Sequence, residues 1–289
     1  MDTIKQAYLT GERALFHASD VQVEDSTFAQ GESPLKESRN IRLHNSIFKW
    51  KYPLWYSTDI ECSHITLMET ARSGIWYSEH VTMKDCVLQA PKTFRRCSDI
   101  TLENVQLPNA QETFWNCSDI RLQRVHAAGD YFAMNAENIT IDEFTLSGNY
   151  AFDGAKHVEL HHATLLSKDA FWNCEDVTVY DSLIIGEYLG WNAKNVRFVN
   201  CTIDSLQGMC YIENLVMKNC RLIHTALAFE YSTVDAQIQG KIDSVLNPSG
   251  GIIRTDEIGE LIIEKDKVDP AKTRIICQKD GKFEGCVCA

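Results

Sequence analysis

A repeat of about nineteen residues runs through the chain and constrains the fold more than any other feature of the sequence. An aliphatic residue, usually preceded by Asp or Asn, recurs at successive spacings of 19 to 21 residues. Its positions are Val21, Ile41, Ile60, Val81, Ile100, Ile120, Ile139, Val158, Val177, Val196, Leu215 and Val234. One repeat of this length cannot bury an apolar side alone, whereas stacked repeats share a continuous interior. The repeat therefore predicts a solenoid.

Each repeat also carries a strand-like pattern. Apolar residues stand two and seven positions after the aliphatic anchor, as Met83 and Leu88 do after Val81. Alternation with period two, broken by a polar step, is typical of short strands joined by tight bends. Asp or Asn before the anchor tolerates the left-handed backbone of a turn, so this column indicates bends rather than catalysis. The pattern predicts an all-β parallel β-helix of about 12 coils, each of three short strands.

A leucine-rich-repeat solenoid is the alternative fold. The run Cys97-x-x-Ile100-x-Leu102-x-x-Val105-x-Leu107 fits the spacing of that repeat, although nineteen residues is shorter than its usual length. For the β-helix we expect residues 1–14 to form an N-terminal cap, residues 15–242 the helix, and residues 243–289 a C-terminal cap and tail. A closing strand is expected near residues 274–277, followed by a mobile tail.

Several stretches resemble a bacterial family catalogued as domain of unknown function 3737 (DUF3737), and the resemblance covers nearly the whole chain. The stretches are ESPLKE at 32–37, KWKYPLWY at 49–56, FRRC at 94–97, GDYFAMN at 129–135, GNYAFDG at 148–154 and GMCYI at 208–212. The resemblance implies a single-stranded right-handed β-helix of the pectin-lyase-like kind. It supplies no catalytic residues.

The composition of the chain bears on its cellular location and on the partners that it can bind. No apolar run approaches the roughly 18 residues that span a bilayer, so we expect no membrane association. Residues 1–16 do not read as a secretory signal, and a cytoplasmic location is therefore expected. The formal net charge of −12 opposes binding to the phosphates of nucleic acid. No feature of the sequence indicates the oligomeric state.

The eleven cysteines read as structural rather than metal-binding. Most occupy the small-residue columns of the repeat, where a buried thiol acts as a small hydrophobe. Neighbouring coils would place Cys97 near Cys117, but a cytoplasmic chain with an odd count favours free thiols. The Cys286-x-Cys288 tail and the histidines at 157, 161 and 162 lack convergent ligand geometry. We expect no metal site and no cofactor.

One side of each coil, from nine to four positions before the anchor, is rich in aromatic and charged residues. Five of the six tryptophans share the column five before the anchor, as Trp115 and Trp172 do. Alternation favours an inward Trp column that fills the core and turns the Phe column one position earlier outward. The opposite orientation would give a carbohydrate groove, in which flat rings cover sugar faces. In both cases the Tyr and charged columns lie outside.

This side contributes the candidate site residues. The candidate ligand-binding residues are Arg72, Lys92, Arg95, Arg96, Trp115, Asp130, Tyr131, Tyr150, Trp172, Tyr188 and Trp191. Asp153, Asp169 and Glu187 are candidate catalytic carboxylates. Carboxylates one or two coils apart lie about 5 or 10 Å apart, which brackets the separations in retaining and inverting glycosidases. The alternative role for these carboxylates is structural, in ion pairs with Lys168 and hydrogen bonds with Tyr hydroxyls.

The function that these columns favour is binding, and possibly processing, of a saccharide. An enzyme would be a polysaccharide lyase or glycoside hydrolase, but the Asn-Thr-Asp, Asp-Asp and Gly-His-Gly elements of pectin-degrading hydrolases are missing. One alternative is a non-catalytic glycan-binding module. The other is a structural or protein-interaction β-helix that uses the aromatic side as a subunit interface.

Overall fold

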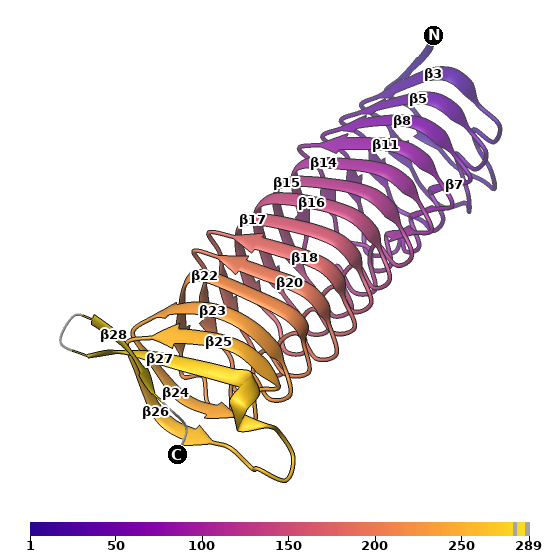
Figure 1. Cartoon of the computed structure of the whole chain (residues 1–289). Coiled ribbons are helices and arrows are strands. Elements are labelled where there is room, and N and C mark those ends of the chain that lie inside the picture. The colour runs from indigo at the N-terminus through magenta and orange to yellow at the C-terminus, as the bar shows by residue number, and fades with distance from the viewer. Residues whose placement is uncertain (280–281, 287–289) are drawn as a thin grey trace. The chain divides into compact units, whose positions relative to one another are not determined.

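The computed structural model describes residues 1–279 and 282–286, and the chain forms two compact units, residues 1–148 and 149–289. Within each unit, short strands lie one above another along successive coils (Figure 1). The described residues contain no α-helix, and the one helical turn is the 3₁₀ segment η1 (Pro270–Lys272). The all-β parallel β-helix is therefore confirmed, and the leucine-rich-repeat alternative is not supported.

The first unit contains sixteen strands. They are β1 (Asp2–Lys5), β2 (Tyr8–Leu9), β3 (Ser19–Glu24), β4 (Thr27–Phe28), β5 (Arg39–His44), β6 (Ile47–Phe48), β7 (Leu54–Trp55), β8 (Thr58–Ser63), β9 (Thr66–Leu67), β10 (Ile75–Trp76), β11 (Glu79–Lys84), β12 (Val87–Leu88), β13 (Phe94–Arg95), β14 (Ser98–Leu107), β15 (Ser118–Ala128) and β16 (Glu137–Ser147).

The second unit contains the remaining described strands. They are β17 (Lys156–Leu166), β18 (Glu175–Tyr180), β19 (Leu183–Ile185), β20 (Lys194–Val199), β21 (Thr202–Asp204), β22 (Glu213–Ile223), β23 (Thr233–Gln239), β24 (Lys241–Leu246), β25 (Gly250–Thr255), β26 (Glu257–Ile262), β27 (Thr273–Lys279) and β28 (Lys282–Cys286). The pair β27–β28 is antiparallel, and the other pairings recorded in this unit are parallel.

Strand register places equivalent residues of successive repeats side by side. Val81 in β11 pairs with Ile60 on one side and with Ile100 on the other. In the second unit Val177 pairs with Val158 and Val196 in the same way. Within each unit, a sequence column is therefore a spatial stripe.

Parallel pairing continues beyond the predicted 15–242 range at both ends. At the start of the chain, β1 pairs with β3 and β2 with β4. Towards the other end, β25 pairs with β23 and then with β27, which spans the closing strand expected near residues 274–277. The predicted tail lies partly outside the described residues, since Cys288 is among those not described.

The interior is built from the anchor column, the column two positions later and the Phe column. Val81 and Met83 are fully buried. Phe rings stack along the interior, with Phe94 and Phe114 4.7 Å apart between centroids and 5° from parallel. Stacked aromatic pairs add about 0.5–1.5 kcal/mol beyond the burial of their apolar area.

Bends recur wherever the sequence pattern breaks. The residue before the anchor has a positive φ in coil after coil, as at Asp20 (59°), Asn40 (51°) and Asp119 (57°). Asn and Asp are the residues that adopt this conformation at least cost, and their side chains also bond from coil to coil. Asn40 Nδ2 donates to Asp20 Oδ1 at 2.6 Å, and Asn138 Nδ2 to Asp119 Oδ1 at 3.0 Å. The turn role predicted for this column is confirmed.

The small-residue columns form hydrogen-bonded ladders inside the helix. Ser57 N donates to Ser78 Oγ at 3.1 Å, Ser78 N to Cys97 Sγ at 3.5 Å, and Cys97 N to Cys117 Sγ at 3.4 Å. Each hydroxyl or thiol satisfies a backbone N–H that the bend removes from strand pairing. Where these columns hold Ser or Cys, the side chain is small and accepts a hydrogen bond, whereas other coils hold a buried Ala at the same position, as at Ala136 and Ala155.

Candidate functional site

The Trp column lies on the outside of the coil, so the inward orientation that alternation favours is wrong. Trp76 and Trp115 are half-buried, whereas Phe94 and Phe114, one position earlier in the repeat, are fully buried. The residue after each Trp has a positive φ, for example Tyr77 at 56°. That left-handed residue shifts the alternation by one step, so the Trp column and the small column two positions later face opposite ways.

Four of the five indoles in this column are hydrogen-bonded to a backbone carbonyl of the next coil. Trp55 Nε1 donates to Ser73 O at 2.7 Å, and Trp115 Nε1 donates to Tyr131 O at 2.8 Å. The accepting carbonyl belongs to a residue with positive φ, 53° at Ser73 and 57° at Tyr131. The Trp column therefore caps backbone carbonyls that the bends leave without strand partners.

In the first unit the outward rings form a continuous ladder that includes a cation. Trp55 and Trp76 stack with centroids 5.1 Å apart and planes 5° from parallel. The Arg95 guanidinium lies 4.8 Å from the Trp76 centroid and 4.6 Å from the Trp115 centroid. Its Nε is buried with no hydrogen-bond partner among the described residues, so the two indole faces are what surround it. The ring faces are thus occupied by neighbours, and the ring edges point outward.

Glu112 balances the charge beside this ladder. It binds Arg95 and Lys92, each at 2.9 Å. Partial burial opposes ionisation of Glu112, but hydrogen bonds and charge from Lys92 and Arg95 hold its pKa below the ordinary value. Two of the four cations predicted on this side therefore share one carboxylate, whose single negative charge offsets one of their two positive charges, while Arg72 and Arg96 are exposed and form no ion pair in the described part of the chain.

The second unit contains an open hollow of about 620 Å³ at the C-terminal ends of β17, β19 and β21 and the bends that follow them. Leu166, Ile185 and Leu206 are 43%, 39% and 45% exposed and form its apolar part. Its full lining is Asn149, Leu166, Ser167, Lys168, Ile185, Gly186, Glu187, Asp204, Leu206 and His224. The volume lies within the roughly 300–1,000 Å³ of small-molecule sites.

Two ion pairs supply the polar groups of this hollow. Lys168 Nζ binds Glu187 Oε2 at 2.9 Å. His224 Nδ1 lies 2.9 Å from Asp204 Oδ2, and this hydrogen bond together with the negative charge of Asp204 raises the pKa of His224. Apolar, anionic, cationic and imidazole groups therefore converge on one open site.

Asp169 stands beside the hollow in a different environment from Glu187. Asp169 is only 9% exposed, and its backbone N–H donates to Glu187 O at 2.9 Å in the next coil. Burial and the charge of Glu187 raise the pKa of Asp169, against the attraction of Lys168 and a hydrogen bond from Tyr150. A carboxyl group whose pKa is raised by burial thus lies beside a glutamate that an ammonium group binds, and acid–base pairs combine carboxyl groups in such unlike environments.

The other predicted carboxylate is not brought to this site. Asp153 accepts a hydrogen bond from Asn173 Nδ2 at 2.9 Å and does not line the hollow. The aromatic candidates of this unit form their own outward ladder, in which Trp172 and Trp191 lie 6.1 Å apart and Trp172 Nε1 donates to Tyr188 O at 2.8 Å. Asp130 and Tyr131 belong to the first unit, where Tyr131 lies edge-on to Trp115 at 6.2 Å.

Sequence reasoning missed Asp204 and His224. They stand eight and nine positions after their anchors, in columns where earlier coils of the second unit hold Leu166 and Ile185, and Ser167 and Gly186, respectively. The available signal was the break in those columns, because a charged pair appears where the preceding coils have Ile185 and Gly186. Comparing equivalent positions of the repeat finds residue types that recur, whereas this site is formed by residues that differ from the rest of their columns.

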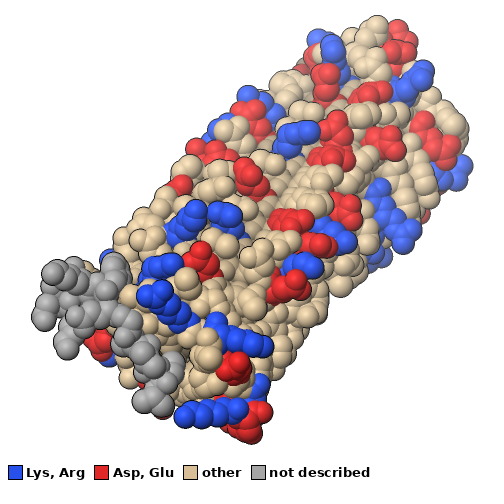
Figure 2. Space-filling model, viewed as in Figure 1, with Lys and Arg blue, Asp and Glu red and all other residues tan. Residues whose placement is uncertain are grey.

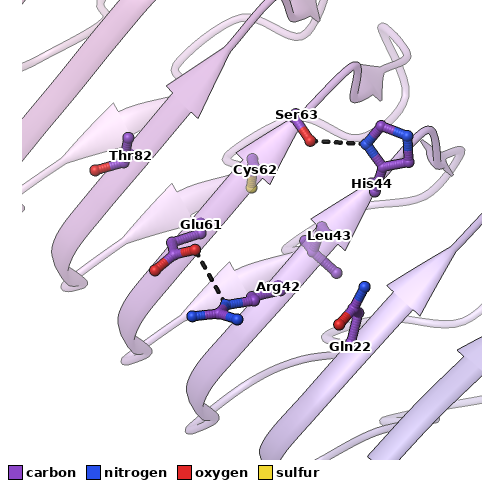
Figure 3. Close-up of a pocket in the computed structure, with 8 residues that line it drawn as sticks. All are labelled: Gln22, Arg42, Leu43, His44, Glu61, Cys62, Ser63 and Thr82. Carbon is purple, nitrogen blue, oxygen red and sulfur yellow. Dashed lines mark hydrogen bonds and ion pairs between the residues drawn. The ribbon is translucent and has the colours of Figure 1, made fainter. Parts of the chain in front are cut away.

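A second open hollow, of about 480 Å³, lies on the sheet face of the first unit (Figure 3). There Arg42 Nε points to Glu61 Oε2 at 3.1 Å, and His44 Nδ1 to Ser63 Oγ at 2.8 Å. Figure 2 shows the same interleaving of Lys and Arg with Asp and Glu over the face in view. These polar groups bind one another from coil to coil, and the lining apolar residues Leu43 and Cys62 are buried. This face is therefore a weaker candidate for a ligand site than the hollow of the second unit.

Within residues 1–279 and 282–286, no group of three or more His, Cys, Asp or Glu side chains could hold a metal ion. A search of the same residues for helices finds none that is both long and apolar enough to cross a membrane. Described cysteines of the small columns, such as Cys97 and Cys174, are buried thiols that form no disulfide.

Comparison with known proteins gives one family match. Residues 2–276 match the model of a family described as "Protein of unknown function (DUF3737)". No curated protein matches the chain. Similar solved structures include the A-module of the mannuronan C-5 epimerase AlgE4 of Azotobacter vinelandii, with a TM-score of 0.43, 10% identity, and coverage of 82% of this chain and 90% of that one. Another is PfbA, a surface adhesin of Streptococcus pneumoniae, with a TM-score of 0.43, 9% identity, and coverage of 92% and 86%.

Proposed function

Because the chain belongs to the DUF3737 family, whose description names no activity, we propose from its residues that it binds a saccharide in the hollow of the second unit. The observation that carries this proposal is the lining, with three exposed aliphatic side chains beside two ion pairs. Sugars present C–H surfaces that pack on apolar groups and hydroxyls that bond to carboxylates, amides and imidazole. Sites of this size usually combine an apolar lining with a few placed polar groups.

The lining assigns roles to individual residues. Leu166, Ile185 and Leu206 contact the apolar surface of the sugar ring. Glu187 and Asp204 accept hydrogen bonds from hydroxyls, while Lys168 and His224, which bind these carboxylates, donate to ring or hydroxyl oxygens. The ladder residues Trp172, Trp191, Tyr150 and Tyr188 position the neighbouring coils.

The finer proposal is that the bound saccharide is also processed. Asp169, whose pKa is raised by burial, would donate a proton to the leaving glycosidic oxygen, while Glu187 would take a proton from the water that attacks the anomeric carbon. Asp153 has no part in this step, because it accepts a hydrogen bond from Asn173, whereas the backbone N–H of Asp169 donates to Glu187 O beside the hollow. In the first unit, Arg72, Lys92, Arg95, Arg96, Trp115, Asp130 and Tyr131 remain candidates for binding a saccharide in that unit.

A thermal-shift screen against neutral and acidic oligosaccharides tests the binding proposal. A ligand at 100 times its Kd stabilises the fold by about 2.7 kcal/mol. With an unfolding entropy of about 2.1 cal/mol/K per residue over 289 residues, this raises Tm by about 4 °C. The shift should disappear in Glu187→Gln and His224→Ala and persist in His157→Ala, which removes a similar exposed pair, His157 with Asp176 at 3.3 Å. The proposal is wrong if no saccharide shifts Tm, or if His157→Ala loses the shift as His224→Ala does.

Processing is tested separately, by release of reducing ends or unsaturated products from a saccharide that binds. Asp169→Asn should abolish turnover while leaving the thermal shift in place. A rate unchanged in Asp169→Asn would remove Asp169 from the proposed acid–base pair without affecting the binding proposal.

A further inference from the structure

The outward ladder of the first unit has a second, more exposed row beside it. Tyr56 and Tyr77 stack at 4.8 Å with planes 4° from parallel. Lys36 Nζ lies 5.6 Å from the Tyr56 centroid, and the Arg96 guanidinium lies 5.8 Å from the Tyr77 centroid. We call the row Lys36, Tyr56, Tyr77 and Arg96 the cationic strip. It is a pair of stacked rings held between two positive charges.

The strip presents a surface suited to anions. Because the faces of both Tyr rings are covered by stacking, their edges point outward, and ring edges carry the positive part of the aromatic quadrupole. Arg96 forms no ion pair in the described part of the chain, whereas Lys36 lies 3.5 Å from Glu37. Tyr and Arg are also the residues that most often dominate protein interfaces. The strip therefore favours an acidic partner that lies along several coils.

The second unit carries a row of opposite sign at the same positions of the repeat. Asn192 Nδ2 donates to Asn173 Oδ1 at 3.0 Å, and Asn173 Nδ2 donates to Asp153 Oδ1 at 2.9 Å, so an exposed amide ladder ends on a carboxylate. At the other end of the row Tyr211 is 39% exposed, and its pKa is raised by burial and by the charge of Glu230. We call the row Asp153, Asn173, Asn192, Tyr211 and Glu230 the acidic strip. Lys267, whose charge acts on Tyr211, is bound by Glu264 at 2.8 Å.

The two strips have the same interval between coils and opposite charge. Parallel strands in each unit are about 4.8 Å apart, so groups that recur once per coil recur at the same interval in both strips. When Arg96 of one copy meets Asp153 of another, Tyr77 and Tyr56 lie opposite Asn173 and Asn192 in the successive coils. The net charge of −12 makes two copies repel each other overall, so the contact depends on the opposite local charges of the two strips. Neither strip contributes a residue to the lining of the saccharide hollow.

We propose that the chain self-associates through contact between the cationic strip of one copy and the acidic strip of another. Arg96 of one copy binds Asp153 of the other, and the tyrosine edges pack along the asparagine amides of the neighbouring coils. This contact is independent of saccharide binding in the hollow, because none of its residues line the hollow.

Sedimentation velocity of the full chain over a concentration series tests the proposal. Association should be strong at a low salt concentration of about 0.1 M, where the Debye length of about 10 Å screens the long-range repulsion between the two acidic chains but not the direct contact, and should weaken at about 1 M, where the Debye length is about 3 Å. Arg96→Asp and Asp153→Arg should each weaken association about tenfold or more, because each places like charges opposite one another. Arg197→Asp, at an exposed position on the sheet face of β20, makes the same charge change outside both strips and should have no effect.

The most decisive experiment mixes the Arg96→Asp chain with the Asp153→Arg chain. The Arg96→Asp chain retains its acidic strip and the Asp153→Arg chain retains its cationic strip, so an equimolar mixture restores opposite charges at every contact and should associate as the wild type does. If Arg96→Asp alters folding, detected as a lower Tm, Lys36→Asp replaces it. A wild type that stays monomeric at low salt over the whole series, or a mixture that fails to recover association, would overturn the proposal.

Discussion

Replacing Ser78 with Ala isolates one step of the internal hydroxyl and thiol ladder. Ser78 is fully buried, accepts from Ser57 N at 3.1 Å and donates to Leu54 O at 2.9 Å. Alanine removes little volume but leaves the N–H of Ser57 buried without an acceptor, which costs about 1–3 kcal/mol. With an unfolding entropy near 2.1 cal/mol/K per residue over 289 residues, we expect Tm to fall by about 2–5 °C.

The repeat itself supplies the control for this prediction. The same column holds Cys97 in the next coil, where its thiol accepts from Ser78 N. Ser78→Cys should therefore lose less than half of what Ser78→Ala loses, and Ser147→Ala, at an exposed position, should lose almost nothing. Urea unfolding followed by Trp fluorescence measures all three variants. Equal stability of Ser78→Ala and the wild type would refute the account of this column as a hydrogen-bonded ladder.

Two further predictions concern the saccharide hollow. A Cβ on Gly186 would lie 1.9 Å from Ser167 O, so Gly186→Ala must displace the backbone and should lower Tm by several degrees. Gly250→Ala, whose added Cβ would have its nearest contact at 3.4 Å, should be tolerated. Equal melting temperatures of the two variants would contradict the close packing of these coils. Because Asp204 raises the pKa of His224, the pair stabilises the folded state below the ordinary His value of 6.5, and this contribution is lost as pH rises through the raised pKa. The stability difference between the wild type and His224→Asn should be present at acidic pH and vanish at alkaline pH, and an NMR titration of His224 that is unchanged by Asp204→Asn would contradict the assignment.

The stacked architecture could be predicted from the sequence because each coil repeats the same chemistry. The anchor at Val81, the apolar Met83 and the turn residue Asn40 all take the positions that their columns predict. The Trp orientation could not be predicted by alternation, since left-handed residues such as Tyr77 shift the phase, and Tyr gives no sequence signal for that conformation. Alternation assumes an extended backbone, so it predicts the wrong side-chain direction wherever the chain bends at a residue type that does not indicate a bend.

The candidate site was only partly predictable for a related reason. Lys168, Asp169 and Glu187 were found because they lie in columns rich in polar groups, and the structure places them close together. Asp204 and His224 interrupt columns that look structural, and their pairing depends on the register of β21 and β22. The repeat in the sequence predicts the scaffold. The local site is formed by residues that differ from the rest of their columns, and only the structure shows that these residues lie close together.

A crystal structure of the full chain would test most directly the claim that sequence columns become stripes of defined orientation. The account predicts electron density for the Arg95 guanidinium between the Trp76 and Trp115 rings on the outside of the coil, with Phe94 and Phe114 stacked inside. Indole rings found in the interior, with the phenylalanines turned to solvent, would contradict it.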